Sequence, residues 1–360
     1  MGRYGRETCS PIRRDYRPLS LYLRIPSMQN SEIAVIIPCH DSERFLGRTA
    51  SALLHQDFGL PYRLIFVNDA SSDKTADILK FIKSYDPDKV TIIDSSAHNL
   101  PQARNAAMDL ALESRFVCFS DADDVPHPDF LSSLYSLING SGADCACRGY
   151  RIIDENTGKV NRAKILDLAQ PLSGFRAAFE ILRDGPVKAF VWSKIFSSSL
   201  LRRTRIRFLP ERFVYEDLAF CFQTFLASDK VAFSDLPVYD YYIHKGSLSH
   251  TPNADGFMMH LCAYAACRAY SSFLIGEKKS LDMFRRMRMN MIYKTDCDIL
   301  TARSLYPAGI RQPMSLARQL IKRICNPGFK VVGEPWEQYI IDLGVLSHPM
   351  LESFSNPASN

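Results

Sequence analysis

Two acidic groups hold the residues best suited to chemistry. The sequence DADD at 121–124 follows a short apolar run, and the pair Glu216 and Asp217 opens an apolar stretch with helical spacing. Carboxylates that converge after a buried strand repel one another unless a cation or a hydrogen-bond donor compensates. A hard divalent cation, Mg²⁺ or Mn²⁺, binds one or two such carboxylates together with substrate phosphates. The DADD group is therefore a candidate metal site.

Other interpretations of both groups are open. The aspartates of DADD could be solvated acids that cap the next helix. DADDV also fits an apolar strand followed by DxDxV, as in phosphatases with an aspartyl nucleophile, although such a site normally lies on the first strand of its domain. In the second group, a carboxylate suits a general base, yet acids at a helix N-terminus stabilise the helix dipole whether or not they catalyse.

The elements that must position these acids alternate between strand and helix. Strand patterns cover 32–41, 62–69, 90–95 and 115–123, and helical spacing covers 42–56, 71–84 and 100–114. Ser42 is the expected N-cap of the first helix, and Ser71 or Ser72 that of the second. This alternation predicts an α/β fold with a mostly parallel sheet and helices on both faces, which binds ligands beyond the carboxyl ends of its strands.

Glycine-rich phosphate loops are missing from the sequence. Neither GxGxxG nor GxxxxGK[ST] follows any of the predicted strands. Because those loops are the common way to cradle phosphates with backbone N–H groups, a phosphate-bearing ligand must be held differently here. A metal ion on the DADD carboxylates is the obvious candidate.

The chain divides into three expected regions. Residues 1–30 carry six arginines, two acids and three prolines, which predicts a basic, loosely ordered leader. Met28 stands just before the first strand, so an upstream start site is another explanation of this leader. Residues 31–250 form the α/β domain, with a strand pair at 144–160. Residues 251–360 form a helical region whose basic amphipathic stretches suit packing on the sheet, a membrane surface or the acceptor side.

Composition excludes several classes of protein. A net charge of +5 in 360 residues is too mild to argue for a nucleic-acid partner. The ten cysteines lack CxxC pairs, which argues against a zinc site or a disulfide framework and fits a reducing cytoplasm. No run approaches the roughly 18 apolar residues of a membrane span, and the N-terminus lacks the apolar core of a secretory signal. We expect a cytoplasmic protein, peripheral at most on the inner face of the cell membrane.

Taken in order, these motifs resemble those of the family 2 glycosyltransferases with the GT-A fold, over about residues 32–250. The matching segments are VIIPCHDSERFL (35–46), FVNDASSD (66–73), NLPQARNAAMDLA (99–111), SDADD (120–124), VWSKIF (191–196), YEDLAFCFQ (215–223) and YYIHKGSLS (241–249). Two positions depart from the family pattern. Asparagine is commoner at the position of Asp41, and Asn68 replaces the first acid of VDDGSxD while Asp69 is kept.

The resemblance implies a set of donor-binding residues. They are Pro38, Asp41, Asp69, Arg104, Asp121 and Ala122. The loop from Pro38 to Asp41 would line the nucleoside pocket, and Asp69 would hydrogen-bond the base, most often uracil. Arg104, in the family's ARN triplet with Asn105, would steer the anionic donor.

The resemblance also implies the metal site and the base. Asp123 would be the direct ligand of Mn²⁺ or Mg²⁺, with Asp121 facing the ribose or a metal-bound water. His244 is a further candidate ligand or phosphate donor, although a lone histidine is more often structural. Asp217, in its pair with Glu216, would remove the proton of the acceptor hydroxyl, and the anomeric configuration would invert.

The acceptor side is the least defined part of this interpretation. Trp192 and Lys194 could shape it, although Trp192 suits the core equally well. Lys245 could steer a phosphate-linked acceptor, and His250 lies in the same stretch.

The expected function is therefore metal-dependent inverting transfer of a sugar from a nucleotide-diphosphate sugar, with UDP favoured, to a hydroxyl of a growing glycan. A lipid-linked surface polysaccharide is the expected acceptor. The alternative is a non-catalytic partner in polysaccharide assembly that binds only nucleotide or glycan.

Overall fold

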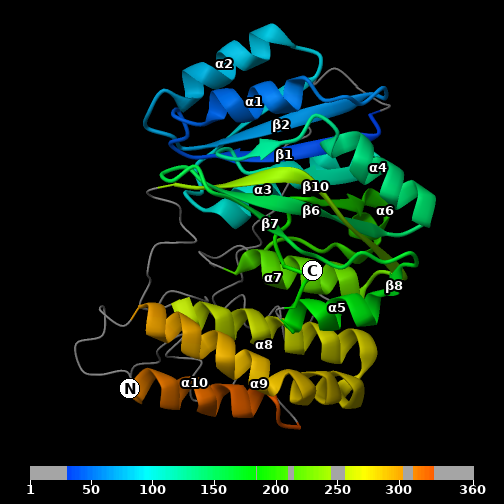
Figure 1. The fold of residues 1–360 in the computed structure, drawn as a ribbon, viewed down its shortest axis with the longest axis vertical. Coiled ribbons are helices and arrows are strands. Elements are labelled where there is room, and N and C mark those ends of the chain that lie inside the picture. Colours follow the sequence, from blue (N-terminus) through cyan, green and yellow to red (C-terminus); the bar gives the residue numbers. More distant parts are fainter. Residues whose placement is uncertain (1–30, 184, 210–214, 245–255, 303–310, 328–360) are drawn as a thin grey trace, which may run out of the picture.

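A sheet of ten strands runs through the upper part of the molecule, and three C-terminal helices lie beneath it (Figure 1). The computed structural model describes residues 31–183, 185–209, 215–244, 256–302 and 311–327. The predicted leader at 1–30, Lys245 and His250 lie outside the described residues.

Strands and helices alternate through the first half of the chain. The strands are β1 (Ile33–Cys39), β2 (Tyr62–Asp69), β3 (Val90–Ser95), β4 (Phe116–Phe119), β5 (Val125–Pro126), β6 (Cys145–Asp154), β7 (Val160–Ala163), β8 (Leu172–Ser173), β9 (Lys194–Ser197) and β10 (Lys230–Ile243). The helices are α1 (Leu46–Leu54), α2 (Thr75–Tyr85), α3 (Leu100–Ala111), α4 (Phe130–Ser141), α5 (Gly174–Leu182), α6 (Ser198–Thr204), α7 (Glu216–Leu226), α8 (Gly256–Ile275), α9 (Glu277–Thr301) and α10 (Arg311–Ile324).

The sheet has a parallel half and a mixed half. Its strand order is β3-β2-β1-β4-β9-β6-β10-β5, with β7 on β6 and β8 on β10. β1 pairs in parallel with β2 and β4, and β2 with β3, which confirms the predicted α/β alternation. β9 runs antiparallel to β4 and β6, whereas β6 and β10 pair in parallel. The predicted strand pair at 144–160 is confirmed, since β7 returns antiparallel on β6.

β1 lies between two hydrophobic cores, one on each face of the sheet. Ala34 and Ile36 belong to the core that α3, α5 and α7 cover. Ile33, Val35 and Ile37 belong to the core under α1, α2 and α4. Successive side chains of a strand point to opposite faces, so a strand that is covered on both faces reads as one apolar run. This double burial fixes the strands that carry the acidic loops.

The starts of α1 and α2 differ from prediction. Neither Ser42 nor Ser71 nor Ser72 caps its helix with its side chain. The Ser42 N–H instead donates to Thr75 Oγ1 at 2.7 Å, and the Ser72 N–H donates to Asp41 Oδ1 at 2.7 Å. The predicted caps are wrong because these residues bind across two loops that are distant in the chain.

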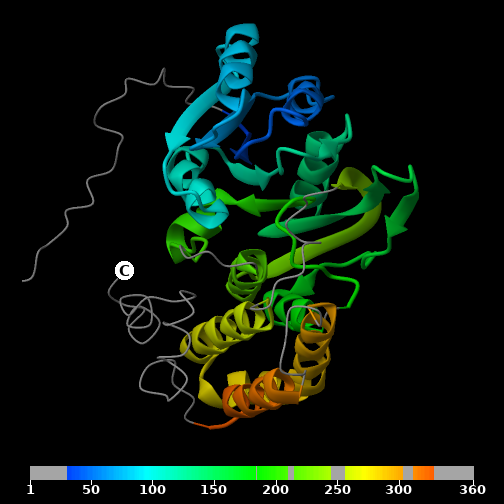
Figure 2. The ribbon, with the colours of Figure 1, turned by 90° about the vertical axis from the view of Figure 1, so that its left-hand side faces the viewer.

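The C-terminal helices form a layer beneath α5 and α7, in which α8 packs on α7 and α9, and α10 packs on both α8 and α9 (Figure 2). In α9, the side chains of Met283, Phe284, Met287 and Met291 are buried at helical spacing. Over the described ranges, no helix is long and apolar enough to cross a bilayer. The helical C-terminal region of the predicted fold is therefore confirmed.

Gly174 provides a test of the contact between α5 and α7. A Cβ atom at Gly174 would overlap the carbonyl oxygens of Phe225 and Ser228, whereas a Cβ at Gly47 in α1 would meet nothing within 4 Å. We expect Gly174→Ala to lower the free energy of unfolding by about 1–3 kcal/mol, as overpacking does. Gly47→Ala is the matched control and should stabilise by up to about 1 kcal/mol, because alanine favours a helix. Thermal unfolding that ranks the two variants equally would contradict this packing.

Candidate active site

The predicted donor-binding residues gather at one edge of the sheet. Because β1, β2 and β4 are parallel neighbours, their carboxyl ends lie side by side. Asp41 follows β1, Asp69 ends β2 and Asp121 follows β4. Pro38 lies within β1 and pairs with Val67 of β2. This is the edge at which open α/β sheets bind ligands.

Asp41 joins the loop after β1 to the loop after β2. Its φ is +45°, and its Oδ1 accepts the N–H groups of Ser72 at 2.7 Å and Asp73 at 3.3 Å. The backbone hydrogen bond from Ser72 is the main cause that lowers the pKa of the Asp41 carboxyl. In return, Asp73 Oδ2 accepts the N–H of Glu43 at 2.9 Å. The two loops therefore brace each other at the ligand edge.

Asp69 orders the segment that leads from β3 into α3. Its Oδ1 accepts the N–H groups of Ala97 and His98, both at 3.0 Å, and the Ser95 hydroxyl at 2.8 Å. Its Oδ2 accepts the N–H of Asn99 at 2.6 Å. Both oxygens of this buried carboxylate are thus engaged within the protein. The contact between Asp69 and a donor base stays a prediction.

Arg104 brings the two acidic groups together. It lies in the first half of α3, which begins after the N-cap Asn99. Its side chain is only 1% exposed. Nη2 donates to Asp121 Oδ1 at 3.0 Å, and Nη1 donates to Glu216 Oε1 and Asp217 Oδ1, both at 2.7 Å. Residues from the end of β4 and the start of α7, which are far apart in the chain, therefore meet on one guanidinium.

The neighbour of Arg104 in the ARN triplet has a supporting role. The Asn105 side chain donates to the carbonyl of Phe208 at 2.8 Å and accepts the N–H of Phe208 at 3.0 Å. The Phe208 ring stacks on Phe220 of α7, with ring centroids 4.1 Å apart. Asn105 therefore links α3 to α7 beside the Arg104 contacts.

The two carboxylates of α7 differ in access to solvent. The Glu216 side chain is 8% exposed and the Asp217 side chain 16%. Asp217 Oδ2 also accepts the N–H of Val191 at 3.2 Å, so both of its oxygens are held in place. Asp217 is the member of the pair that a substrate hydroxyl reaches more easily.

Burial changes the protonation of this cluster. Burial, followed by the charge of Asp217, raises the pKa of Glu216 to about 8, against the opposing effect of Arg104. Burial also raises the pKa of Asp121 to about 6, again opposed by Arg104. Burial alone would lower the pKa of Arg104, but Asp217, Asp121 and Glu216 outweigh it and raise that pKa. One guanidinium cannot fully compensate the buried Glu216 carboxylate together with the partly buried carboxylates of Asp121 and Asp217.

The predicted metal side contains a carboxylate and an imidazole in contact. Asp123 Oδ2 lies 2.9 Å from His244 Nε2. The turn that presents Asp123 is held by Arg48, whose Nη2 donates to the Asp123 carbonyl at 2.6 Å, and by Thr49, whose hydroxyl contacts the Ala122 carbonyl at 2.9 Å. Arg48 in turn pairs with Glu155 at 2.6 Å. Two helical residues and one distant glutamate thus fix the DADD turn.

The donor set fits a hard divalent ion only in part. Over the described residues, no group of three His, Cys, Asp or Glu side chains is arranged to hold a metal ion by itself. Asp121, Asp123 and His244 nevertheless offer two carboxylates and one imidazole, and Mg²⁺ or Mn²⁺ commonly completes its shell with waters and substrate phosphates. The assignment of Asp121, Asp123 and His244 to a metal ion stays a prediction.

The predicted acceptor-side residues that the structure describes lie in the interior. The Trp192 ring is stacked between Phe190 and Tyr239, with centroid distances of 4.6 and 4.9 Å. Lys194 is buried, and its Nζ donates to the carbonyl of Phe190. Both residues are packed in the core, and their direct contact with an acceptor stays a prediction.

Sequence reasoning missed several residues that shape the site. Arg48, Glu155 and the Val191 N–H lie outside any acidic or glycine-rich motif. Asp124, which sequence grouped with its neighbours, is fully buried and accepts the Tyr242 N–H at 2.8 Å. Burial raises its pKa well above the usual value. The signal available in sequence was only that Asp124 precedes an apolar turn.

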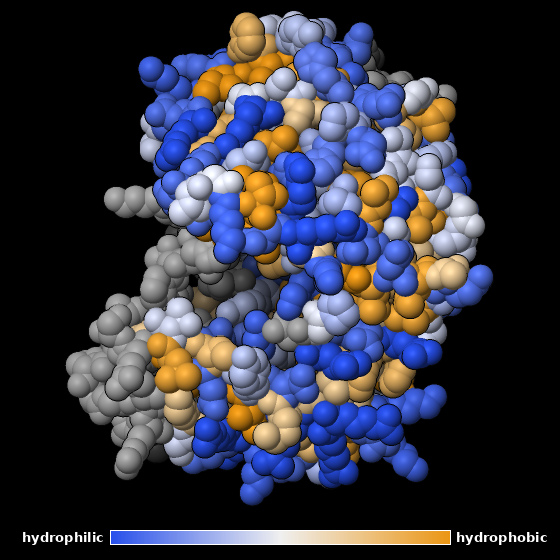
Figure 3. Space-filling model, viewed as in Figure 1, coloured by the Kyte–Doolittle hydropathy of each residue, from blue (hydrophilic) through white to orange (hydrophobic). Residues whose placement is uncertain are grey.

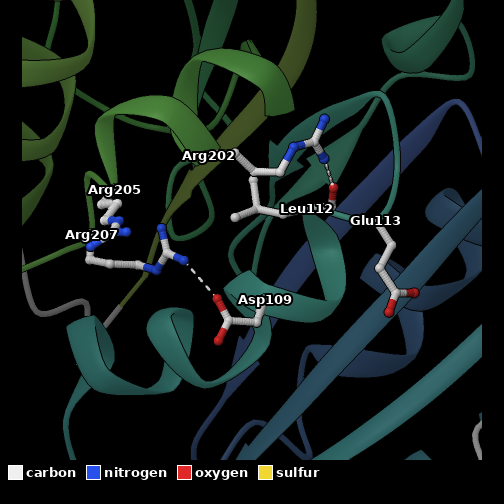
Figure 4. A pocket seen from close by; sticks show the side chains of 6 residues that line it. All are labelled: Asp109, Leu112, Glu113, Arg202, Arg205 and Arg207. Atoms are coloured by element: carbon white, nitrogen blue, oxygen red, sulfur yellow. Dashed lines mark hydrogen bonds and ion pairs between the residues drawn. The ribbon is translucent and has the colours of Figure 1, made fainter. Parts of the chain in front are cut away.

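An open hollow lies away from these acids. Its lining residues are Asp109, Leu112, Glu113, Arg202, Arg205 and Arg207 (Figure 4). Arg207 pairs with Asp109 at 2.6 Å, and Arg202 donates to the Leu112 carbonyl. It contains none of the predicted donor, metal or base residues.

A model of the family described as glycosyl transferase family 2 matches residues 34–225, which is more than half of the chain and includes both acidic groups. The chain belongs to this family. It is a glycosyltransferase that uses a nucleotide sugar, as the ordered motifs predict.

Known relatives agree with the family. EpsH of Bacillus subtilis, named as a candidate glycosyltransferase, is 25% identical over 72% of this chain and 73% of its own length. The processive diacylglycerol beta-glycosyltransferase of Mycoplasma pneumoniae is 22% identical over 65% of this chain and 70% of its own. The poly(ribitol-phosphate) beta-N-acetylglucosaminyltransferase TarS of Staphylococcus aureus is 23% identical over 62% of this chain but only 37% of its own.

Solved structures agree on the fold. The crystal structure of residues 1–349 of S. aureus TarS in complex with UDP-GlcNAc superposes with a TM-score of 0.55 at 16% identity. The match covers 84% of this chain and 98% of that one. This likeness confirms the predicted GT-A fold of the family 2 glycosyltransferase.

Removal of Arg104 tests how strongly the enzyme depends on the carboxylate cluster. Arg104→Met leaves the buried Glu216 and the partly buried Asp121 and Asp217 without their cation, so we expect the free energy of unfolding to fall by about 3–5 kcal/mol. The control is Arg207→Met, which breaks the exposed pair with Asp109 and should cost less than about 1 kcal/mol. Chemical denaturation of both variants measures the difference. If both variants lost the same free energy of unfolding, the Arg104 contacts would contribute no more than a surface ion pair.

The raised pKa of Glu216 predicts a pH dependence of stability. Its folded-state pKa of about 8 exceeds the ordinary value of 4.5, so the folded enzyme keeps a proton that the unfolded chain loses. This stabilisation is fully present below the ordinary value and is lost as the pH rises through about 8. We expect the melting temperature of the wild type to fall more than that of Glu216→Gln between about pH 5 and pH 8.5. If the melting temperatures of the wild type and of Glu216→Gln changed with pH in the same way, Glu216 would not be protonated in the folded enzyme.

Proposed function

We propose that this enzyme is a metal-dependent inverting transferase that moves a sugar from a UDP-sugar to a hydroxyl of a growing glycan. The observation that carries the proposal is the Arg104 contact, which joins Asp121 of the DADD turn to Asp217 of α7 in one site. A donor-side carboxylate and a candidate base therefore lie within reach of one substrate.

Asp217 performs the proton transfer in this proposal. As the acceptor oxygen attacks the anomeric carbon, its proton passes to the Asp217 carboxylate while the bond from that carbon to the nucleoside diphosphate breaks. Attack opposite the leaving group inverts the anomeric configuration. Arg104 and the Val191 N–H hold the two oxygens of Asp217 and keep it oriented toward the acceptor.

The donor side rests on the edge of β1, β2 and β4. Pro38 and Asp41 lie where a nucleoside would enter, and Asp69 orders the neighbouring segment. A divalent ion on Asp121, Asp123 and His244, when bound, would neutralise the charge that develops on the leaving diphosphate. Support for UDP comes from TarS, whose structure holds UDP-GlcNAc.

The acceptor is proposed as a lipid-linked surface glycan. Relatives that match this chain are named for acceptors as different as poly(ribitol phosphate), diacylglycerol and cholesterol. Several of these are polymers or membrane lipids, which supports an acceptor that is presented at a surface.

Two substitutions separate the donor side from the transfer step. Asp123→Ala should abolish the Mn²⁺-dependent stabilisation by UDP in a thermal shift assay, because the ion loses its carboxylate. Asp217→Asn should still bind UDP but lose transfer by roughly 10²- to 10⁴-fold, as loss of a general base does. Asp109→Asn, an exposed acid beyond the site, is the control. Normal transfer by Asp217→Asn, measured across a panel of UDP- and GDP-sugars, would refute the base assignment.

The outer side of α9 is the proposed contact with the inner face of the membrane. Met289 and Tyr293 are 70% and 68% exposed, and Leu300 shares their stripe of the helix. Arg285 and Arg286 flank this stripe and are exposed. Figure 3 shows hydrophilic and hydrophobic side chains intermixed over the lower part of the molecule, where the C-terminal helices lie. Apolar and basic residues on one exposed helix face suit an anionic lipid surface.

Vesicle binding tests this contact. We expect the enzyme to cosediment with vesicles that contain phosphatidylglycerol and not with phosphatidylcholine alone. Arg286→Gln should weaken binding about fivefold, since a basic residue near an anionic surface contributes about 1 kcal/mol. Met289→Ser should weaken it as well, whereas Phe81→Ser, at an equally exposed apolar residue of α2, is the control. Equal binding by all three variants would exclude α9 as the contact.

A further inference from the structure

Three side chains from three helices meet directly beside the acidic pair of α7. The Tyr215 hydroxyl donates to Asp298 Oδ1 at 3.1 Å, and His260 Nδ1 lies 2.9 Å from Asp298 Oδ2. The Tyr215 ring stacks on the His260 ring, with a centroid distance of 3.9 Å and an interplanar angle of 22°. We name Tyr215, His260 and Asp298 the clasp.

The clasp is enclosed by the C-terminal helices. The His260 side chain is 4% exposed and the Asp298 side chain 18%. Tyr264, one turn further along α8, also stacks on the His260 ring, with a centroid distance of 4.8 Å. A hydrogen bond to a carboxylate contributes more than one between neutral groups. The contact therefore holds α7 firmly against α8 and α9.

The start of α7 depends on support from outside the helix. Tyr215 is the N-cap residue, and no side chain of its own segment caps the helix there. The next two residues are Glu216 and Asp217, so a shift of Tyr215 moves the carboxylates by a similar distance. A displacement of a catalytic group by about 1 Å can lower the reaction rate by about 100-fold.

Arg104 of α3 and the Val191 N–H hold the carboxylate of Asp217. The clasp instead holds the Tyr215 side chain, at the start of α7, against α8 and α9. His260 and Asp298 also lie beyond residue 225, where the match to the family ends. The shared motifs of the family therefore do not supply this support.

We propose that the clasp is a positioning group for the transfer step. Its hydrogen bonds and ring stack fix the N-terminus of α7, and through it the direction in which Asp217 meets the acceptor hydroxyl. The C-terminal helices thereby take part in catalysis without touching the substrate. The proposal rests on the proposed role of Asp217 as the base.

The decisive variant is Tyr215→Phe, which keeps the ring stack on His260 and removes only the hydroxyl. We expect kcat for transfer to fall between about tenfold and 100-fold, as for a displaced catalytic group. The KM for the donor and the Kd for UDP with Mn²⁺ should stay within about twofold of the wild type, because the donor side is untouched. Tyr85→Phe, an exposed tyrosine of α2, is the matched control and should leave kcat unchanged.

A double-mutant cycle with Asp298→Asn keeps the test decisive if one variant folds poorly. If both residues act through the same hydrogen bond, the loss of kcat in the double variant should be no greater than in the worse single variant. Additive losses, or Tyr215→Phe with wild-type kcat, would overturn the clasp. If Tyr215→Phe is normal while Asp217→Asn is inactive, the clasp fails and the proposed base stands. If Asp217→Asn is fully active, the proposed base fails.

Discussion

A guanidinium enclosed by carboxylates is the contact on which the rest of the site depends. Arg104 is almost completely buried, and a cation in that position is stable only if anions surround it. Asp121, Glu216 and Asp217 provide three negative charges against its single positive one. The excess is relieved in part by protons, as the raised pKa values of Glu216 and Asp121 indicate.

The charged side chains of this cluster come from separate elements, so the site forms only when those elements pack together. The Arg104 side chain comes from a helix, Asp121 from a strand end, and Asp217 from another helix, 113 residues after Arg104. Burial of β1 on both faces fixes the strand ends, and the reciprocal bonds between the loops at 40–43 and 71–75 fix the edge beside them. No single segment of the chain contains Arg104, Asp121 and Asp217 together.

Sequence reasoning recovered the elements and their order because hydrophobic periodicity reports burial directly. It also found both acidic groups, since carboxylates after a buried strand or at a helix start stand out in the sequence. It failed where a side chain acts across the fold. Ser42 looks like a helix cap but binds Thr75, and Trp192 offers two uses that only packing could separate. Arg104 was expected to meet a donor, and its bridge between the acids could not be seen without distances.

The C-terminal helices also help to position the acidic pair of α7. The family match ends within α7, so the common motifs supply the sheet edge and the acids but not the surface against which α7 is fixed. In this chain α8 and α9 provide that surface through His260 and Asp298. If Asp217 is the base, as we propose, its direction depends on how the start of α7 is held. Arg104 gives support from α3, and the clasp gives it from α8 and α9, so two separate parts of the fold act on the same turn.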